Sequence, residues 1–263
     1  CTVLFADLSG FTSRTEQLSR LRNGPEQIGR LLNAHLGPLV DIIEAHGGDI
    51  VKFAGDAVLV CWGVDQARDG VRTTILAAAR CALQMQLAIM RLEEDDPDRT
   101  MRLRVGLATG PVRVIHLGSQ DARRVLLVTG DGVDRATKVG TIAEPGEVRI
   151  GRLAHQLVGE ELLTDFDGEA PLVMEVQPFD PIEMPPPPAR HWDTRFAAYL
   201  PRTVTHRVRG QTGTWLTETR VVTVMFVHLG KITIGSDPRR MNQVFETTHS
   251  HLEAHGGITN KLS

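Results

Sequence analysis

The chain has 263 residues, of which 41% are hydrophobic and 23% are charged, and its formal net charge is −3. Its apolar content excludes a wholly disordered protein, and its length suits one large domain or one and a half ordinary ones. The 29 basic and 32 acidic residues give no polybasic field, so we expect no nucleic-acid partner. We find no 18-residue apolar run and expect no membrane span, and three unpatterned cysteines indicate a reducing, cytoplasmic compartment.

The first two thirds of the chain alternate strand-like and helix-like patterns. We predict a strand at 1–7, a loop at 8–12, a helical stretch at 13–46, a hairpin at 50–61, a helix at 71–93, strands at 102–109, 112–116 and 124–128, a helix at 131–142 and a strand at 147–150. This β-α-β-β-α-β order predicts an α+β, ferredoxin-like domain with a mixed sheet. One face of such a sheet is left open for a partner, and a second copy of the domain is a candidate.

Two pairs of segments show that the chain repeats itself. VLFADLSGFT at 3–12 matches VMFVHLGKIT at 224–233, and both have the pattern of a buried strand that leads into a loop. IEAHGGDIVKF at 43–53 matches LEAHGGITNKL at 252–262, with a lysine four residues after the second glycine in each. We therefore interpret the chain as containing two copies of one domain.

These repeats predict three regions. The first domain covers 1–177, a proline-containing linker covers 178–220, and the start of a second copy covers 221–263. The run Pro185–Pro188 in the linker favours extended geometry. We expect Trp192–Leu200 to form a short helix that lies against a domain.

Two aspartates suggest metal and phosphate chemistry. Asp7 ends an apolar strand, and the loop Leu8–Thr12 leads into a helix, where backbone N–H groups favour phosphate. Asp56 follows Gly55 at the tip of the predicted hairpin. Two carboxylates held together repel unless they share a proton or bind a cation, and a pair of Mg²⁺ ions with substrate phosphates relieves the repulsion. Either aspartate taken alone would also suit a helix cap or a turn.

At these residues a family resemblance becomes specific. The motifs FADLSGFT, GGDIVKFAGDA, RVGLATGPV and VTGDGVDRATK occur in an order and at a spacing that resemble class III nucleotidyl cyclase catalytic domains, over essentially all of the first copy. The tandem layout and the proline-containing connector resemble most the bicarbonate-sensitive soluble adenylyl cyclases and their bacterial relatives. In that family two domains pair head to tail and form one composite active site at their interface.

The resemblance implies a role for each matching residue of the first copy. Asp7 and Asp56 would hold two Mg²⁺ ions, for which Mn²⁺ substitutes, and the Leu8 carbonyl would touch one of them. The residues implied to contact the nucleotide phosphates are Ser9, Gly10, Phe11, Thr12 and Arg104. ATP would be converted to cyclic AMP and pyrophosphate by in-line attack of the ribose 3′-hydroxyl on the α-phosphorus.

The resemblance also implies a contribution from a second domain. Lys261 of the second copy would contact the nucleotide, and an Asn and an Arg would hold the ribose and stabilise charge on the α-phosphate. The sequence stops at Ser263, before the segment that would carry this pair. We therefore expect the rest of the second domain, or a second chain, to complete the site, and weak or no activity from this polypeptide alone.

The two copies depart from the family pattern in complementary ways. In the first copy Asp134 and Lys138 occupy the Asn and Arg positions, and in the second copy His228 replaces the metal-binding aspartate. This predicts one working site and one vestigial site. The vestigial site of the soluble adenylyl cyclases binds bicarbonate, for which Lys52 and Lys138 could supply cations, although Asp134 would repel the anion. Ordinary surface or interface lysines are an equal alternative.

The sequence leaves three other functions to compare with adenylate cyclase. One is a non-catalytic cyclase-homology module that binds nucleotide or a small anion and regulates a neighbouring domain. Another is a guanylate cyclase, because Lys261 is the only residue in the sequence that indicates a preference for adenine. A diguanylate cyclase is disfavoured, because Gly47-Gly48-Asp49 continues with Ile50-Val51 rather than with Glu-Phe.

Overall fold

The computed structural model describes residues 1–63, 70–94, 101–119, 123–165, 168–179, 194–200, 223–228 and 237–259. These residues form two compact units. Unit 1 is built from the described residues within 1–112 and 130–179, and unit 2 from those within 113–129, 194–200, 223–228 and 237–259.

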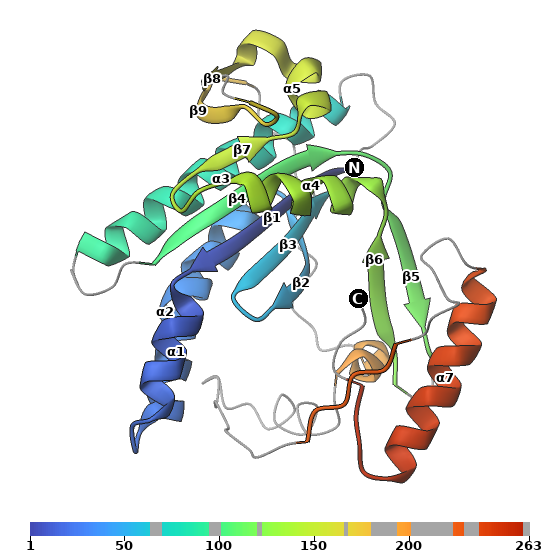
Figure 1. Ribbon diagram of the computed structural model, residues 1–263. Coiled ribbons are helices and arrows are strands. Elements are labelled where there is room, and N and C mark those ends of the chain that lie inside the picture. Colours follow the sequence, from blue (N-terminus) through green and yellow to red (C-terminus); the bar gives the residue numbers. More distant parts are fainter. Residues whose placement is uncertain are drawn as a thin grey trace. The chain divides into compact units, whose positions relative to one another are not determined.

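A seven-stranded sheet with the order β2-β3-β1-β4-β7-β9-β8 forms the centre of unit 1 (Figure 1). Its strands are β1 (Thr2–Ser9), β2 (Asp49–Ala54), β3 (Ala57–Trp62), β4 (Arg102–Thr109), β7 (Val148–Ile150), β8 (Leu162–Asp165) and β9 (Leu172–Val176). Strands β4 and β7 are parallel, and the other neighbouring pairs are antiparallel. The predicted α+β domain with a mixed sheet is confirmed.

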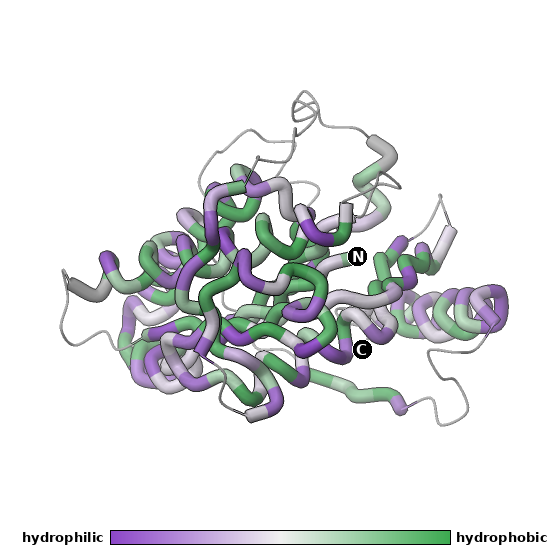
Figure 2. Tube along the Cα trace, turned by 90° about the horizontal axis from the view of Figure 1, so that it is seen from above, coloured by the Kyte–Doolittle hydropathy of each residue, from purple (hydrophilic) through white to green (hydrophobic). Residues whose placement is uncertain are grey.

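Helices cover both faces of the central strands. Helix α3 (Gly70–Glu94) packs on one face of β1 and β4, with α2 (Gly24–Ala45) against α3, and α4 (Asp131–Ile142) packs on the other face (Figure 1). Along β1 the side chains alternate between the faces: the Thr2 hydroxyl hydrogen-bonds that of Thr74 in α3 at 2.9 Å, whereas Phe5 lies against Gly140 of α4. Hydrophobic and hydrophilic residues alternate along the helices in Figure 2, as expected for helices with one face on a core.

The two faces of β1 differ in burial. Leu4, Ala6 and Leu8 are almost completely buried and belong to the main hydrophobic core. Asp7 and Ser9, which point to the face shared with α4, are only partly buried. That face therefore remains accessible at the C-terminal end of β1.

One helix in the described part of the chain, Gly70–Leu92 of α3, is long and apolar enough to cross a membrane by length and composition alone. More than half of its most apolar stretch is buried in unit 1. Ile75, Ala78 and Met85 have no exposed surface and lie in the core beneath the sheet. Packing in the core therefore accounts for the apolar character of this helix.

The start of unit 1 differs in detail from the prediction. Strand β1 continues to Ser9, and Gly10, with a φ of 86°, turns the chain directly into α1 (Phe11–Ser19). The left-handed backbone at this position favours glycine. The predicted helical stretch 13–46 is two helices, and Pro25 lies in the first turn of α2. The sequence pattern also missed the elements after β7: α5 (Arg152–Val158), the 3₁₀ turn η1 (Gly159–Glu161), β8 and β9.

Unit 2 is a hairpin covered by two later segments. Strands β5 (Arg113–Leu117) and β6 (Val125–Thr129) form the hairpin, and α7 (Pro238–Ala254) packs on it. Met241 and Phe245 of α7 meet Ile115 and Leu117 of β5 in a small hydrophobic core. The predicted helix at 192–200 is seen as the 3₁₀ helix η2 (Thr194–Tyr199).

Helix η2 lies against the strands of this hairpin. The Tyr199 hydroxyl and His116 Nδ1 are 2.7 Å apart, and the Arg124 N–H donates to the Ala198 carbonyl at 2.7 Å. His116 alternates along β5 with Ile115 and Leu117, so its side chain points to the other face of the hairpin. Helix η2 therefore contacts the second face of the hairpin, where Val114 and His116 stay exposed.

The predicted buried strand at 224–233 is wrong for the residues that the structure describes. Residues 223–228 form no strand and are exposed, with Phe226 94% exposed. No described strand lies beside them, so their backbone groups lack the ladder partners that a strand requires. Residues 229–233 and Pro185–Pro188 lie outside the described residues.

Candidate active site

Asp7 and Asp56 lie at the ends of two neighbouring strands of unit 1. The Cα of Asp7 pairs with that of Ala57, the first residue of β3. Asp56 precedes Ala57, and its carbonyl accepts a hydrogen bond from the Leu8 N–H at 3.2 Å. Since cross-strand Cα atoms lie about 5.5 Å apart and consecutive ones about 3.8 Å, the two aspartates have Cα atoms within roughly 9 Å. The structure brings the two residues to one end of the central sheet.

The N-terminus of α1 lies beside Asp56. The Thr12 hydroxyl donates to Asp56 Oδ2 at 3.3 Å, and Thr12 is exposed in the first turn of α1. No side chain in the described part of the chain caps this helix end, which begins after Gly10. The first N–H groups of α1 are therefore available to an anion, and they lie next to the two carboxylates.

Two side chains of the predicted phosphate loop make contacts within the protein and are not available to a phosphate. The Ser9 hydroxyl donates to the Arg102 carbonyl at 2.8 Å, and Phe11 is buried in the main core. These two side chains fix the turn between β1 and α1. A phosphate at this turn would therefore meet backbone N–H groups, since the hydroxyl proton of Thr12 is donated to Asp56.

Arg104 faces Asp7 across the sheet. The two residues are directly opposite each other in the register of β1 and β4, and Arg104 Nη2 contacts Asp7 Oδ2 in an ion pair. The side chain of Asp7 is 23% exposed and that of Arg104 is 37% exposed, so solvent and ligands can reach both. Sequence reasoning assigned Arg104 to the nucleotide and missed its contact with Asp7, which depends on the strand register.

The donors at this end of the sheet suit Mg²⁺. Among the described residues, no group of three or more His, Cys, Asp or Glu side chains could hold a metal ion alone. Mg²⁺ commonly binds through one or two carboxylates and keeps the remaining positions for water and substrate phosphates. Partly exposed Asp7 and Asp56, beside a helix N-terminus, fit that donor set.

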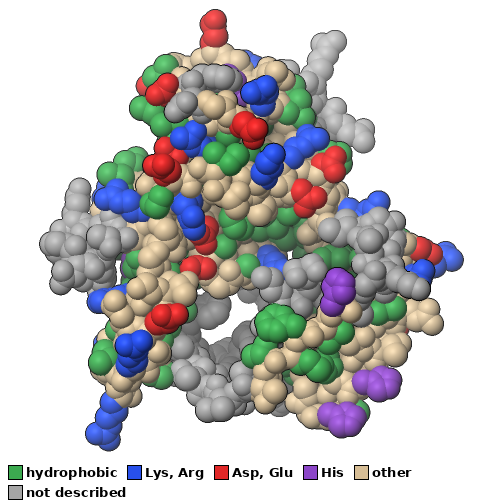
Figure 3. All heavy atoms as spheres, in the orientation of Figure 1, with side chains coloured by type: hydrophobic (Ala, Val, Ile, Leu, Met, Phe, Trp, Pro, Cys, Tyr) green, Lys and Arg blue, Asp and Glu red, His purple; other side chains and the backbone are tan. Residues whose placement is uncertain are grey.

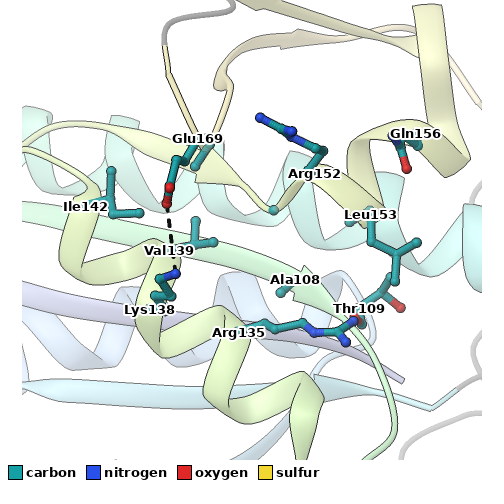
Figure 4. A pocket seen from close by; sticks show the side chains of 13 residues that line it. Ala108, Thr109, Arg135, Lys138, Val139, Ile142, Arg152, Leu153, Gln156 and Glu169 are labelled. Carbon is teal, nitrogen blue, oxygen red and sulfur yellow. Dashed lines mark hydrogen bonds and ion pairs between the residues drawn. The ribbon is translucent and has the colours of Figure 1, made fainter.

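Lys138 lies elsewhere in unit 1, in a pocket of about 450 Å³ between α4 and α5 (Figure 4). Its Nζ is 3.9 Å from the carboxylate of Glu169, and Arg135 and Arg152 also line the pocket. Thr109 in the pocket wall pairs with Thr2, at the opposite end of β1 from Asp7. The pocket is therefore separate from the two aspartates.

The remaining predicted residues are scattered or lie outside the described part. Lys52 is on β2 at the edge of the sheet, whereas α4, which carries Lys138 and exposed Asp134, packs on β1, β4 and β7. Unit 1 by itself does not bring Lys52 to Lys138, and a bicarbonate site stays a prediction. His228 is exposed in unit 2, and Lys261 lies outside the described residues.

The buried cysteines are poor candidates for chemistry. Burial raises the pKa of Cys61 to about 11 and that of Cys81 to about 12. Both thiols therefore stay protonated at neutral pH and are weak nucleophiles and metal ligands.

On the face seen in Figure 3, acidic and basic side chains of unit 1 are interspersed, so this face offers no electrostatic field of a single sign.

Comparison with known proteins supplies relatives for this arrangement. The family described as "Adenylate and Guanylate cyclase catalytic domain" matches residues 1–177. Adenylate cyclase type 10 of Rattus norvegicus is 28% identical over 198 residues, which are 74% of this chain and 12% of that protein. An adenylate cyclase of Mycobacterium tuberculosis is 32% identical over 149 residues, which are 57% of this chain and 31% of that protein. The chain thus spans between about a tenth and a third of these relatives.

Solved structures show the same fold. The guanylyl cyclase Cya2 is 28% identical with a TM-score of 0.52, and the match covers 65% of this chain and 88% of that one. A class III adenylyl cyclase-like ATP-binding protein from Pseudomonas aeruginosa is 25% identical with a TM-score of 0.53, over 61% of this chain and 35% of that one.

Proposed function

Because the chain belongs to the adenylate and guanylate cyclase catalytic domain family, which matches residues 1–177, we propose that it converts ATP to 3′,5′-cyclic AMP and pyrophosphate in cyclic-nucleotide signalling. The observation that supports this best is the placement of Asp7 and Asp56 on adjacent strand ends beside the N-terminus of α1. The similarity to adenylate cyclases of rat and of Mycobacterium tuberculosis favours ATP over GTP.

In this proposal each residue at the end of the sheet has a distinct task. Asp7 and Asp56 would hold two Mg²⁺ ions, which when bound would neutralise phosphate charge and lower the pKa of the ribose 3′-hydroxyl. The free N–H groups of α1 hold phosphate oxygens, and the Thr12 hydroxyl fixes the orientation of the Asp56 carboxylate. Arg104 contributes positive charge next to the terminal phosphates.

The proposed site needs a second cyclase domain. Unit 1 has Asp134 and Lys138 where the family has the Asn and Arg that hold the ribose and the α-phosphate. We propose that these two groups, together with Lys261, come from the second copy continued in the same protein or from another chain. Electrostatic stabilisation by such an arginine commonly accounts for 10²- to 10³-fold or more in rate.

Asp7 gives the most direct test. We expect cyclic AMP formation from Mg-ATP, measured with the second cyclase domain supplied in excess, to fall about 10³-fold or more in Asp7→Asn and Asp56→Asn. Asp41→Asn, an exposed change on α2, is the matched control and should retain the wild-type rate. Wild-type turnover in Asp7→Asn would overturn the proposal, and faster turnover of Mg-GTP would change the substrate.

A second candidate function is nucleotide binding without turnover. It is favoured by Asp134 and Lys138 at the Asn and Arg positions, and by the similarity to a cyclase-like ATP-binding protein of Pseudomonas aeruginosa. Such a module would bind ATP and change the state of a neighbouring domain. Saturable ATP binding with no cyclic nucleotide, even with a complete second domain present, would select this function.

A further inference from the structure

The ion pair between Asp7 and Arg104 has consequences for the order in which ligands bind. Asp7 is the only carboxylate that contacts Arg104 among the described residues, and the two are cross-strand neighbours on the partly open face of the sheet. Their strands are adjacent inner strands of the unit 1 sheet, so their separation is fixed by the β-ladder. The guanidinium of Arg104 thus contacts the Asp7 carboxylate, which is proposed to bind a metal ion.

The guanidinium of Arg104 is only partly engaged. Its Nη2 contacts Asp7, whereas its Nε is buried and has no hydrogen-bond partner in the described part of the chain, so it becomes available only when the side chain turns. A guanidinium has five N–H donors, so this side chain retains unused donors for an anion with several oxygens, such as a phosphate. Its 37% exposure lets the outer part of the group turn toward such an anion.

Electrostatics sets the direction of the effect on a metal ion. The positive charge of Arg104 compensates Asp7, and a divalent cation that approaches the same carboxylate meets a like charge a few ångströms away. A phosphate group near Arg104 reverses this, because it neutralises the guanidinium and offers further oxygen ligands to the metal. Metal and phosphate should therefore bind with positive coupling.

We propose that Arg104 acts as a gate on the Asp7 metal site. In the free protein it weakens metal binding at Asp7, and the phosphates of the nucleotide draw its guanidinium away and allow the metal to bind tightly. This inference rests on the function proposed above and deepens it. It gives Arg104 a second role besides the proposed phosphate contact, and this role appears in metal affinity before any turnover.

The test measures Mn²⁺ binding to the full chain without nucleotide, with free Mn²⁺ followed by electron paramagnetic resonance. We expect Arg104→Met to bind Mn²⁺ about three- to tenfold more tightly than wild type. Arg104→Lys keeps the charge and should stay near wild type. Arg102→Met, which removes the same charge two residues away on the same face of β4, should change the affinity less than twofold.

A second arm repeats the titration with millimolar inorganic phosphate. Wild type should bind Mn²⁺ more tightly with phosphate than without it. Arg104→Met should gain little affinity from phosphate, because it has no guanidinium for the phosphate to neutralise. The proposal would be overturned if wild type and Arg104→Met bound Mn²⁺ with equal affinity without nucleotide. It would also be overturned if phosphate raised the Mn²⁺ affinity of both proteins by the same factor.

Asp7→Asn separates this inference from the proposed function. If Mn²⁺ binds the wild type and is lost in Asp7→Asn, the metal site is present and the comparison of Arg104 variants decides the gate alone. If Asp7→Asn binds Mn²⁺ as tightly as wild type, both with and without phosphate, the proposed metal site and the gate both fail. Protection of the buried Cys61 and Cys81 thiols from labelling shows that each variant is folded.

Discussion

The helix ends at His46-Gly47-Gly48 and at His255-Gly256-Gly257 are built alike, one in each unit. Gly47 has a φ of 73° and Gly256 a φ of 74°. The N–H of Gly48 donates to the Ile43 carbonyl at 3.0 Å, and that of Gly257 donates to the Leu252 carbonyl at 2.7 Å. At both helix ends this bond spans five residues, as in a Schellman cap.

The two segments 3–7 and 224–228, which the sequence predicts to be equivalent, differ in structure. Residues 3–7 lie in β1, which is paired with β3 on one side and β4 on the other. The matching residues 224–228 form no strand and are exposed. A helix cap closes its hydrogen bonds within six residues, whereas a strand depends on partners distant in sequence. Local sequence identity therefore reproduces the cap but not the strand.

The largest expected difference between the copies is at Leu4 and Met225, which occupy matching positions. Leu4→Ala should lower the free energy of unfolding of unit 1 by about 3–5 kcal/mol, because Leu4 has no exposed surface. Met225→Ala, at a side chain 62% exposed, should change stability by less than about 0.5 kcal/mol. Denaturant-dependent labelling of Cys61 and Cys81, after Cys1→Ser, reports opening of unit 1, and hydrogen exchange in α7 reports opening of unit 2. A cost above 2 kcal/mol for Met225→Ala would show that 223–228 is buried in solution.

The second glycine of each cap gives a smaller difference. A Cβ at Gly48 would lie 2.7 Å from side-chain atoms of Trp62 and Val60. Gly48→Ala should therefore destabilise unit 1 by about 1–3 kcal/mol through overpacking. At Gly257 the nearest atom to such a Cβ is the Leu252 carbonyl oxygen at 3.1 Å, so Gly257→Ala should cost less, below about 1 kcal/mol. Hydrogen exchange in α2 and α7 measures both, and equal losses would contradict the prediction.

The first glycine of each cap should show no difference between the copies. Gly47→Ala and Gly256→Ala both place an alanine at a left-handed φ, which costs about 1 kcal/mol at either site. Asn at the same positions should recover part of the loss, because it tolerates this conformation better. Costs that differ by more than twofold in hydrogen exchange would mean that the cap depends on its surroundings.

The smallest expected effect is an acid response confined to unit 1. A hydrogen bond from Arg149, at 2.7 Å, holds the pKa of Glu147 below its usual value of 4.5. A depressed carboxylate pKa contributes stability above the unfolded-state pKa, and this contribution is lost as the pH falls below 4.5 toward the folded-state pKa. In Glu147→Gln the stability of unit 1, followed by thiol labelling after acid exposure, should vary less with pH in that window. An unchanged pH profile would contradict this role.

Most of unit 1 could be predicted because its patterns are periodic. The strands β1, β3 and β4 and the helices α3 and α4 follow from apolar periods, and the resemblance joined Asp7 and Asp56 to one function. The contact of Arg104 with Asp7 could not be predicted, because a strand register is fixed only by the whole sheet. The elements between Arg152 and Val176 are too short for their periodicity to stand out.

The hairpin of unit 2 has a consequence for how the protein is made and expressed. Strands β5 and β6 lie within the span of the family match, but the residues that cover Ile115 and Leu117 come from α7, more than a hundred positions later. On the ribosome, the hairpin would emerge well before its cover. A recombinant fragment cut after residue 177 would carry an uncovered apolar ribbon and would be prone to self-association.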